Sequence, residues 1–232
     1  MFLPLHDTNP LKVIRFQMVS GTIIILNILV FFYTHYALGT QAGNEANLSW
    51  GMVPAVLTGN ASLPSDLARI PEVATLFTYM FIHAGWLHVI GNMAFMWVFA
   101  DNVEDAFGHF RFLAFYLFCG VAAALVHTAI NPASQAPLVG ASGAVAGVIA
   151  AYLVLYPKAR IWVLLFLKIP VPVPALFALA GWFGFQVISL AGPQSGDVVV
   201  AFWAHIGGFL TGLVIALFLK ARMLRRLAGG KG

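Results

Sequence analysis

Residues 138–157 read Leu138-Val-Gly-Ala-Ser142-Gly-Ala-Val-Ala-Gly-Val-Ile-Ala-Ala-Tyr-Leu-Val-Leu-Tyr-Pro157. This stretch carries no charge, and Ser142 is its only polar side chain before Tyr152. From Ser142 to Pro157 a helix would rise about 22 Å, less than the roughly 30 Å of a bilayer's hydrocarbon core. We therefore expect a short helix whose N-terminus, with Ser142, lies below the membrane surface beside a cavity that admits water.

The composition of the whole chain also indicates a membrane protein. Of the 232 residues, 61% are hydrophobic and 9% are charged, whereas soluble domains carry about 25% charged residues. The net charge of +4 comes from basic residues in short flanks between apolar runs. That placement is typical of membrane topology signals, so no nucleic-acid partner is predicted. The single cysteine, Cys119, rules out a disulfide within the chain.

Six apolar segments predict six spanning helices, and the predicted fold is an all-α, polytopic, six-transmembrane-helix bundle in a lipid bilayer. A basic flank precedes the first segment, as in a signal peptide, but no convincing cleavage site follows, so a retained helix is expected. We predict three parts: a cytoplasmic N-terminal segment 1–16, a six-helix domain 17–220 and a basic cytoplasmic tail 221–232. The six segments are 17–37, 85–105, 110–130, 142–157, 174–192 and 202–220.

Two connections stand out. Residues 38–72 form the longest polar connection, and its apolar pieces indicate that it packs on the membrane surface. Residues 160–172 are apolar but are interrupted by prolines and are too short to span, so an interfacial loop is expected.

The basic residues give the orientation. With six spans, eleven of the twelve lysines and arginines fall on one side, and Arg69 alone falls on the other. The positive-inside rule makes the first side cytoplasmic. Both termini are then cytoplasmic, and the predicted location is a cell membrane of the bacterial cytoplasmic type.

Polar side chains within the apolar segments mark a candidate site. His88 and Asn92 lie near the start of the segment 85–105, Ser142 opens the segment 142–157, and His205 lies near the start of the segment 202–220. These three segments all begin on the outer side, so the four residues should lie at similar depth. Polar groups inside a bilayer are costly and usually functional.

The residue types suggest hydrolysis. A serine hydroxyl needs a base to become a nucleophile, and His205 is the best candidate. No acidic residue is placed to orient His205, so a Ser-His dyad is expected. His88 and Asn92 are four residues apart and share a helix face, from which they could stabilise an oxyanion together with the backbone N–H of Ser142. The small-residue pairs Gly143/Gly147 and Gly208/Gly212 would let the two helices approach closely.

These motifs, in this order, resemble those of the rhomboid intramembrane proteases. The resemblance covers nearly all of the region from His83 to Gly212. It implies Ser142 as nucleophile, His205 as base, an oxyanion site of the Ser142 N–H with His88 and Asn92, and no cofactor or metal. It further implies single-span membrane proteins as substrates, cut near the outer face. The matching motifs are His83-Ala-Gly-Trp-Leu-His88-Val-Ile-Gly-Asn92, Glu104-Asp-Ala-Phe-Gly108, Gly140-Ala-Ser142-Gly143 and Ala204-His205-Ile-Gly-Gly208 with Gly212.

The resemblance also implies a substrate gate. Trp182 matches a position that borders the gate, and the partner position on the segment 85–105 is Gly91, which offers no aromatic ring. Structural support is expected from His83, Glu104, Gly140, Gly143, Gly208 and Gly212, with Glu104 making an ion pair or hydrogen bond on the cytoplasmic side.

Other interpretations remain open. Taken alone, Ser142 could be a packing residue, His205 a core histidine, and His88 and Asn92 contacts between helices. A metal-dependent hydrolase could use His83, His88 and His205, although the sequence has no HExxH motif. A catalytically silent relative that binds and escorts membrane proteins is the second alternative.

Overall fold

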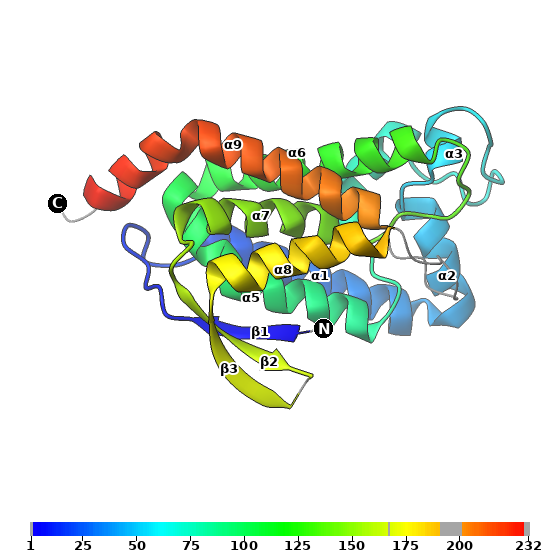
Figure 1. Ribbon diagram of the computed structural model, residues 1–232. Coiled ribbons are helices and arrows are strands. Elements are labelled where there is room, and N and C mark those ends of the chain that lie inside the picture. The colour runs from blue at the N-terminus through cyan, green and yellow to red at the C-terminus, as the bar shows by residue number, and fades with distance from the viewer. Residues whose placement is uncertain (1, 167, 191–200, 230–232) are drawn as a thin grey trace.

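The computed structural model describes residues 2–166, 168–190 and 201–229, and it is mostly helical. Each of the six predicted segments overlaps one long helix, and these helices lie side by side in a bundle (Figure 1). Residues 191 and 192 of the predicted segment 174–192 lie outside the described residues. The six helices are α1 (Met18–Phe32), α5 (Trp86–Phe107), α6 (His109–Ile130), α7 (Ser142–Leu155), α8 (Ala175–Ser189) and α9 (Phe202–Gly229).

Short helices fill the connection between α1 and α5. Met52 and Leu138 form an antiparallel bridge, and the N–H of Ala55 donates to the carbonyl of Ser134 at 2.9 Å. The long connection therefore packs against the stretch that leads into α7. Its elements are η1 (Tyr33–Ala37), α2 (Gly39–Trp50), α3 (Pro54–Leu57), η2 (Glu72–Ala74), α4 (Thr75–Thr78) and η3 (Tyr79–Phe81).

A three-stranded antiparallel sheet corrects two expectations, the all-α chain and the interfacial loop at 160–172. Its order is β1 (Phe2–Asp7), β2 (Arg160–Leu165) and β3 (Ile169–Pro174). In β2, Ile161 and Val163 are buried while Arg160 is exposed, which is the alternation of a half-buried strand. The prolines of β3 occupy alternate positions of an edge strand, where a missing N–H is tolerated.

By length and composition, fewer than six of the described helices could cross a membrane as straight spans. Within the described part of the chain, three stretches are long and apolar enough to cross a membrane: Met18–Ala37, His109–Ile130 and Phe202–Gly229. A fourth is obtained if Glu72–Phe81 and Trp86–Phe107, bent by 80°, form one broken span. The apolar helices α7 and α8 are shorter. The 14 residues of α7 correspond to about 21 Å.

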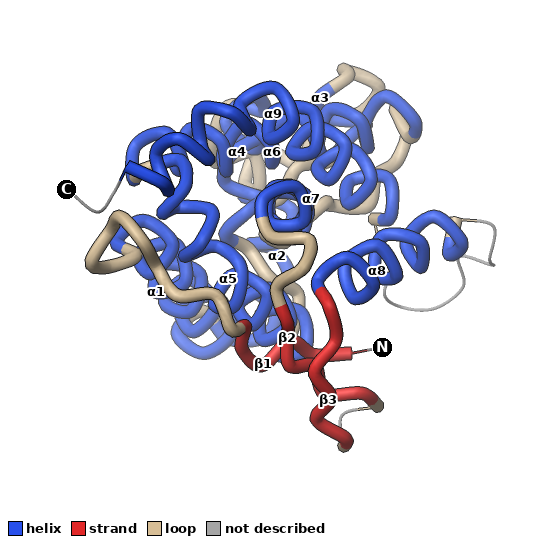
Figure 2. Tube along the Cα trace, turned by 60° about the vertical axis from the view of Figure 1, so that its left-hand side comes forward, coloured by secondary structure: helices blue, strands red, loops and turns tan. Residues whose placement is uncertain are grey.

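Helix α7 is the centre of the bundle, with α5, α8 and α9 around it (Figure 2). From Gly143 to Tyr152 every residue of α7 is buried. A Cβ atom on Gly208 of α9 would overlap the carbonyl oxygen of Gly143, and one on Gly212 would overlap that of Gly147. The two backbones are therefore in contact, which only glycine permits at these positions.

Two carboxylates at the end of α5 hold the N-terminal segment. Glu104 accepts hydrogen bonds from the N–H groups of Val19 and Ser20, at 2.9 and 2.8 Å, and so caps the N-terminus of α1 from another helix. It also contacts His109 at 2.5 Å. Asp105 accepts hydrogen bonds from three successive backbone N–H groups, those of residues 12–14.

Strand β1 is attached to α7 at the same end of the bundle. The hydroxyl of Tyr152 donates a hydrogen bond to the Asp7 carboxyl group. Burial raises the pKa of Asp7 above its usual range, although the hydrogen bond from Tyr152 acts in the opposite direction. This hydrogen bond joins the sheet to the central helix, while its strands pack against α5 and α8.

Candidate active site

Ser142 and His205 face each other across the contact between α7 and α9. The Oγ atom of Ser142 lies 2.8 Å from Nε2 of His205, within hydrogen-bond distance. Ser142 is the first residue of α7, and His205 lies in the first turn of α9. Gly143 and Gly208 bring the two backbones together. Because Ser142 and His205 lie within one helical turn of these glycines, their side chains can meet. The structure thus brings together the two residues that the sequence singles out as nucleophile and base.

Gln186 of α8 is a third member of this cluster, and the sequence analysis missed it. Its Oε1 atom lies 2.9 Å from Nδ1 of His205, and its side chain is only 5% exposed. An amide oxygen can only accept, so the proton on the neutral imidazole must sit on Nδ1. Nε2 then carries the lone pair that accepts the hydroxyl proton of Ser142. A signal was present, because Gln186 is the only amide side chain in the run 175–190.

The polar residues of α5 lie beside the turn that precedes α7. The imidazole of His88 packs against Gly140, where a Cβ atom would overlap its ring. Asn92 is buried, and its Nδ2 atom lies 3.1 Å from Nε2 of His83. The rings of His83 and His88 meet edge to face, with centroids 5.0 Å apart. His83 therefore contacts both of the side chains predicted to stabilise an oxyanion.

The turn before Ser142 requires glycine for two reasons. Gly140 has φ +111°, which L side chains rarely adopt, and His88 fills the space beside its Cα. The N–H of Gly140 donates to the carbonyl of Tyr79 at 2.9 Å, which fixes the turn on η3. The first N–H groups of α7 have no partner within the helix. A developing negative charge on a substrate oxygen near Ser142 would meet these donors and the positive end of the helix dipole.

Trp182 of α8 lies next to this cluster. Its ring centroid is 6.0 Å from that of His205 and 6.0 Å from that of Phe95 on α5. The position that the resemblance pairs with Trp182 is Gly91, which has no ring, but Phe95, one helical turn further along α5, lies beside Trp182. A Cβ atom on Gly91 would have no neighbour within 4 Å.

Glu104 does not belong to this site, because its contacts are with the start of α1 and with His109. Among the described residues, no group of three or more His, Cys, Asp or Glu side chains is arranged to hold a metal ion. The chemistry that the cluster offers is therefore carried by a hydroxyl, an imidazole and amides.

Comparison with known proteins places this geometry in a family. The Rhomboid domain matches residues 71–222, a range that includes all the residues of the cluster. Rhomboid protease AarA of Providencia stuartii is 28% identical over 219 residues, covering 84% of this chain and 70% of that protein.

Two organellar relatives match shorter regions. Presenilin-associated rhomboid-like protein A, mitochondrial, of Danio rerio is 30% identical over 155 residues, covering 66% of this chain. Rhomboid-like protein 11, chloroplastic, of Arabidopsis thaliana is 40% identical over 82 residues, covering 35% of this chain. The chain spans only 38% and 29% of the lengths of these two relatives. The family match extends over more than half of the chain, and the chain is a member of the rhomboid family.

Proposed function

We propose that this protein is an intramembrane serine endopeptidase that cleaves single-span transmembrane proteins with a dyad of Ser142 and His205. The observation that carries the proposal is the 2.8 Å contact between Oγ of Ser142 and Nε2 of His205. A nucleophile within hydrogen-bond reach of a base, which is in turn oriented by a third group, is the arrangement of covalent hydrolases. The similarity to a relative named as a protease supports it.

The proposed reaction has two steps. His205 Nε2 takes the hydroxyl proton as Ser142 Oγ attacks the peptide carbonyl carbon, and the imidazolium then gives that proton to the leaving amine as the C–N bond breaks. A water molecule, deprotonated by the same Nε2, next attacks the acyl-serine, and the proton returns to Oγ as the ester bond breaks. In both steps the Ser142 N–H, His88 and Asn92 would stabilise the oxyanion.

The reaction is proposed to take place in the outer leaflet of a membrane crossed by six helices. Helix α7, at about 21 Å, is shorter than the hydrocarbon core, which favours a Ser142 sunk below the outer surface. Both termini are proposed to be cytoplasmic. A substrate helix would arrive sideways from the lipid, and α8, which carries Trp182, is the proposed gate.

The decisive experiment compares the wild type with Ser142→Ala on a panel of tagged single-span proteins in reconstituted membranes. Cleavage by the wild type alone would support the proposal, and a serine-directed fluorophosphonate should label the wild type but not the variant. Ser65→Ala, at an exposed serine of the long connection, is the matched control and should cleave as the wild type does.

The same experiment separates the alternatives. Binding of substrates without cleavage by any form would favour a silent escort protein. Cleavage that a chelator abolishes, with no fluorophosphonate labelling, would favour the metal-dependent hydrolase.

A further inference from the structure

A cavity lies on the side of α1, apart from the Ser142 cluster. It has a volume of about 430 Å³ and is bounded by α1, η1, α2 and the segment from α4 to Ile82. That volume falls within the range of about 300–1,000 Å³ that is usual for small-molecule sites. Neither Ser142, His205 nor Gln186 lines it, so its occupant would not touch the candidate active site.

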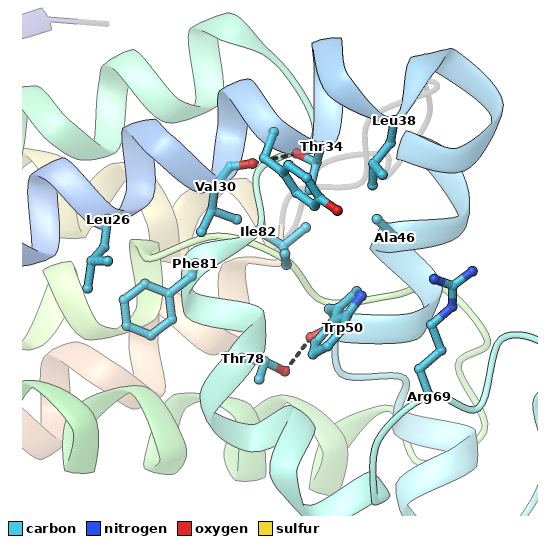
Figure 3. A pocket seen from close by; sticks show the side chains of 11 residues that line it. Leu26, Val30, Thr34, Leu38, Ala46, Trp50, Arg69, Thr78, Phe81 and Ile82 are labelled. Atoms are coloured by element: carbon cyan, nitrogen blue, oxygen red, sulfur yellow. Dashed lines mark hydrogen bonds between the residues drawn. The ribbon is translucent and has the colours of Figure 1, made fainter.

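The interior of this cavity is hydrocarbon in character. Leu26 and Val30 of α1 face Phe81 and Ile82 across it (Figure 3). Two of the three hydroxyls that line it are already engaged, because Thr34 donates to the carbonyl of Val30 at 3.0 Å, and Thr78 donates to that of Trp50 at 2.6 Å. The third belongs to Tyr33, which is 59% exposed. Water needs two to four polar partners to occupy a cavity stably. An apolar chain is therefore the better occupant.

One end of the cavity carries a positive charge. Figure 3 shows Arg69 at this end beside Ala46 and Trp50, with Leu26 and Phe81 at the other end. In the part of the chain that the structure describes, the only hydrogen bond that the Arg69 side chain donates is a long one, from Nε to the carbonyl of Asp66 at 3.4 Å. Within the described ranges, no carboxylate lies within 4.0 Å of its guanidinium. Most of its five donors are thus available to an anion, and guanidinium matches phosphate in a bidentate manner.

The charge and the apolar interior together specify an amphiphile. We propose that this cavity binds a glycerophospholipid, with one acyl chain between α1 and the segment 78–82 and its phosphate on Arg69. Trp50, which is 37% exposed at the same end, is suited to the level of the headgroups, where tryptophan is enriched. A helix with its side chains is about 10–12 Å wide, so a substrate helix is too large for a cavity of this volume.

The proposed lipid site does not include Ser142, so the proposal does not depend on proteolytic activity. It is tested by native mass spectrometry of the full chain released from micelles that contain phosphatidylglycerol. The wild type should retain one phosphatidylglycerol molecule. Arg69→Gln removes the charge at an exposed position and should lower the retained fraction about tenfold, the effect of losing one strong contact. Val30→Phe fills the apolar end and should lower retention while the charge stays in place.

Arg160→Gln is the matched control, because Arg160 is an exposed arginine on β2, at the sheet. It should retain the lipid as the wild type does. Equal retention by the wild type, Arg69→Gln and Val30→Phe would overturn the proposal, as would an equal loss in Arg160→Gln, which would indicate only general attraction between basic residues and anionic lipid. If Val30→Phe does not fold, lipid retention by Arg69→Gln compared with Arg160→Gln is sufficient to test the proposal. Retention of diacylglycerol, which lacks phosphate, as firmly as phosphatidylglycerol would also contradict the assigned role of Arg69.

Discussion

The proposed chemistry of Ser142 depends on which nitrogen of His205 holds the proton. Gln186 Oε1 can only accept a hydrogen bond, so it selects the tautomer with the proton on Nδ1 and leaves Nε2 as the acceptor for the serine hydroxyl. A buried amide does this without bringing a second charge into an apolar environment, where an unpaired carboxylate would be costly. The proposed dyad would thus have an oriented base without an acidic partner.

At the residue scale, the first prediction concerns the dyad itself. Ser142→Ala and His205→Ala should each lower the rate of peptide cleavage by on the order of 10⁴-fold or more, because each removes an essential partner of the same proton transfer. The double variant should be little slower than either single variant. The measurement is cleavage of a tagged substrate in proteoliposomes, with circular dichroism to confirm folding. Independent, multiplying losses would contradict a joint role.

The second prediction concerns Gln186 as a positioning residue. Gln186→Leu should lower kcat by about 10- to 100-fold, the usual effect of removing the partner that orients a functional histidine, while KM changes little. Gln186→Glu supplies an acceptor again and should recover most of the rate. It should also shift the acidic limb of the pH–rate profile to higher pH, because a carboxylate beside Nδ1 favours the imidazolium and raises the pKa that governs that limb.

A purely structural role of Gln186 would give a different pattern. Both variants would then lose thermal stability, and the pH profile would keep its shape. Gln135→Leu, at an exposed glutamine in the loop before α7, is the control and should leave the rate and the profile unchanged.

The third prediction concerns the oxyanion. Asn92→Ala should lower kcat by about 10- to 1,000-fold with less effect on KM, as for the loss of one oxyanion donor. His88→Ala should act similarly. Steady-state kinetics on a reconstituted substrate measure both. Full kcat in both variants would show that the polar face of α5 serves only to contact His83 and the turn at Gly140.

At the element scale, α8 differs from α7 in how it is held. Helix α7 is buried on every side, whereas α8 exposes large apolar side chains, among them Phe177 and Ile188. Its contacts near the cluster are those of Gln186 and Trp182 with His205, of Trp182 with Phe95, and of Phe183 with Phe209. Few inward contacts make an element easier to displace, which is what the proposed lateral gate requires.

The fourth prediction tests this gate. An aromatic pair contributes about 0.5–1.5 kcal/mol beyond the area that it buries, so breaking the pair of Trp182 and Phe95 should raise the open population about 2- to 12-fold. Trp182→Ala and Phe95→Ala should therefore speed cleavage of a membrane-embedded substrate by similar factors. Hydrolysis of a small soluble ester should be nearly unchanged. Phe185→Ala, on the lipid side of α8 and 62% exposed, should change neither rate. Equal acceleration of both substrates would favour a general packing role over gating.

The sequence could predict some elements and residues better than others, for physical reasons. The six long helices follow from apolar runs, and Ser142 and His205 are polar interruptions at the starts of two runs. Gln186 is likewise a polar interruption of an apolar run, but it lies near the end of its helix, because α8 runs in the opposite direction to α7 and α9. A search for polar residues at helix starts alone does not find it.

The strands were harder to predict because their pairing is non-local. Residues 2–7 pair with residues 161–165, across most of the chain. The prolines of β3 are atypical of a strand, although an edge position accepts them. The resemblance to the rhomboid family indicates Gly91 as the partner position of Trp182 on α5. It does not point to Phe95, which lies one helical turn further on and contacts Trp182.

At the scale of the whole molecule, contacts between distant segments restrict the topology. Strand β1 pairs with β2, and the N–H of Thr8 donates to the carbonyl of Arg160 at 3.1 Å. Asp105 binds the N–H groups of residues 12–14, and the Arg226 Nε atom donates to its carbonyl oxygen at 3.0 Å. The N-terminal segment, the β2–β3 hairpin, the turn after α5 and the end of α9 therefore lie on one side of the bundle. These segments carry most of the basic residues.

The fifth prediction is that this basic side faces the cytoplasm. On a Cys119→Ser background, Ser65→Cys in the long connection should react with an impermeant maleimide added to intact cells. Thr8→Cys and Arg225→Cys should react only after the membrane is permeabilised. The contacts of the folded chain require the last two positions to behave alike, whereas only the positive-inside rule decides which side they share.

If both react from outside while Ser65→Cys does not, the fold stands and the orientation is reversed, so that Ser142 would lie in the inner leaflet. If Thr8→Cys and Arg225→Cys react from opposite sides, the chain crosses the membrane an odd number of times between them. The pairing of β1 with β2, the contact of Arg226 with Asp105, or both would then have to be wrong, because together they hold the two ends at one face.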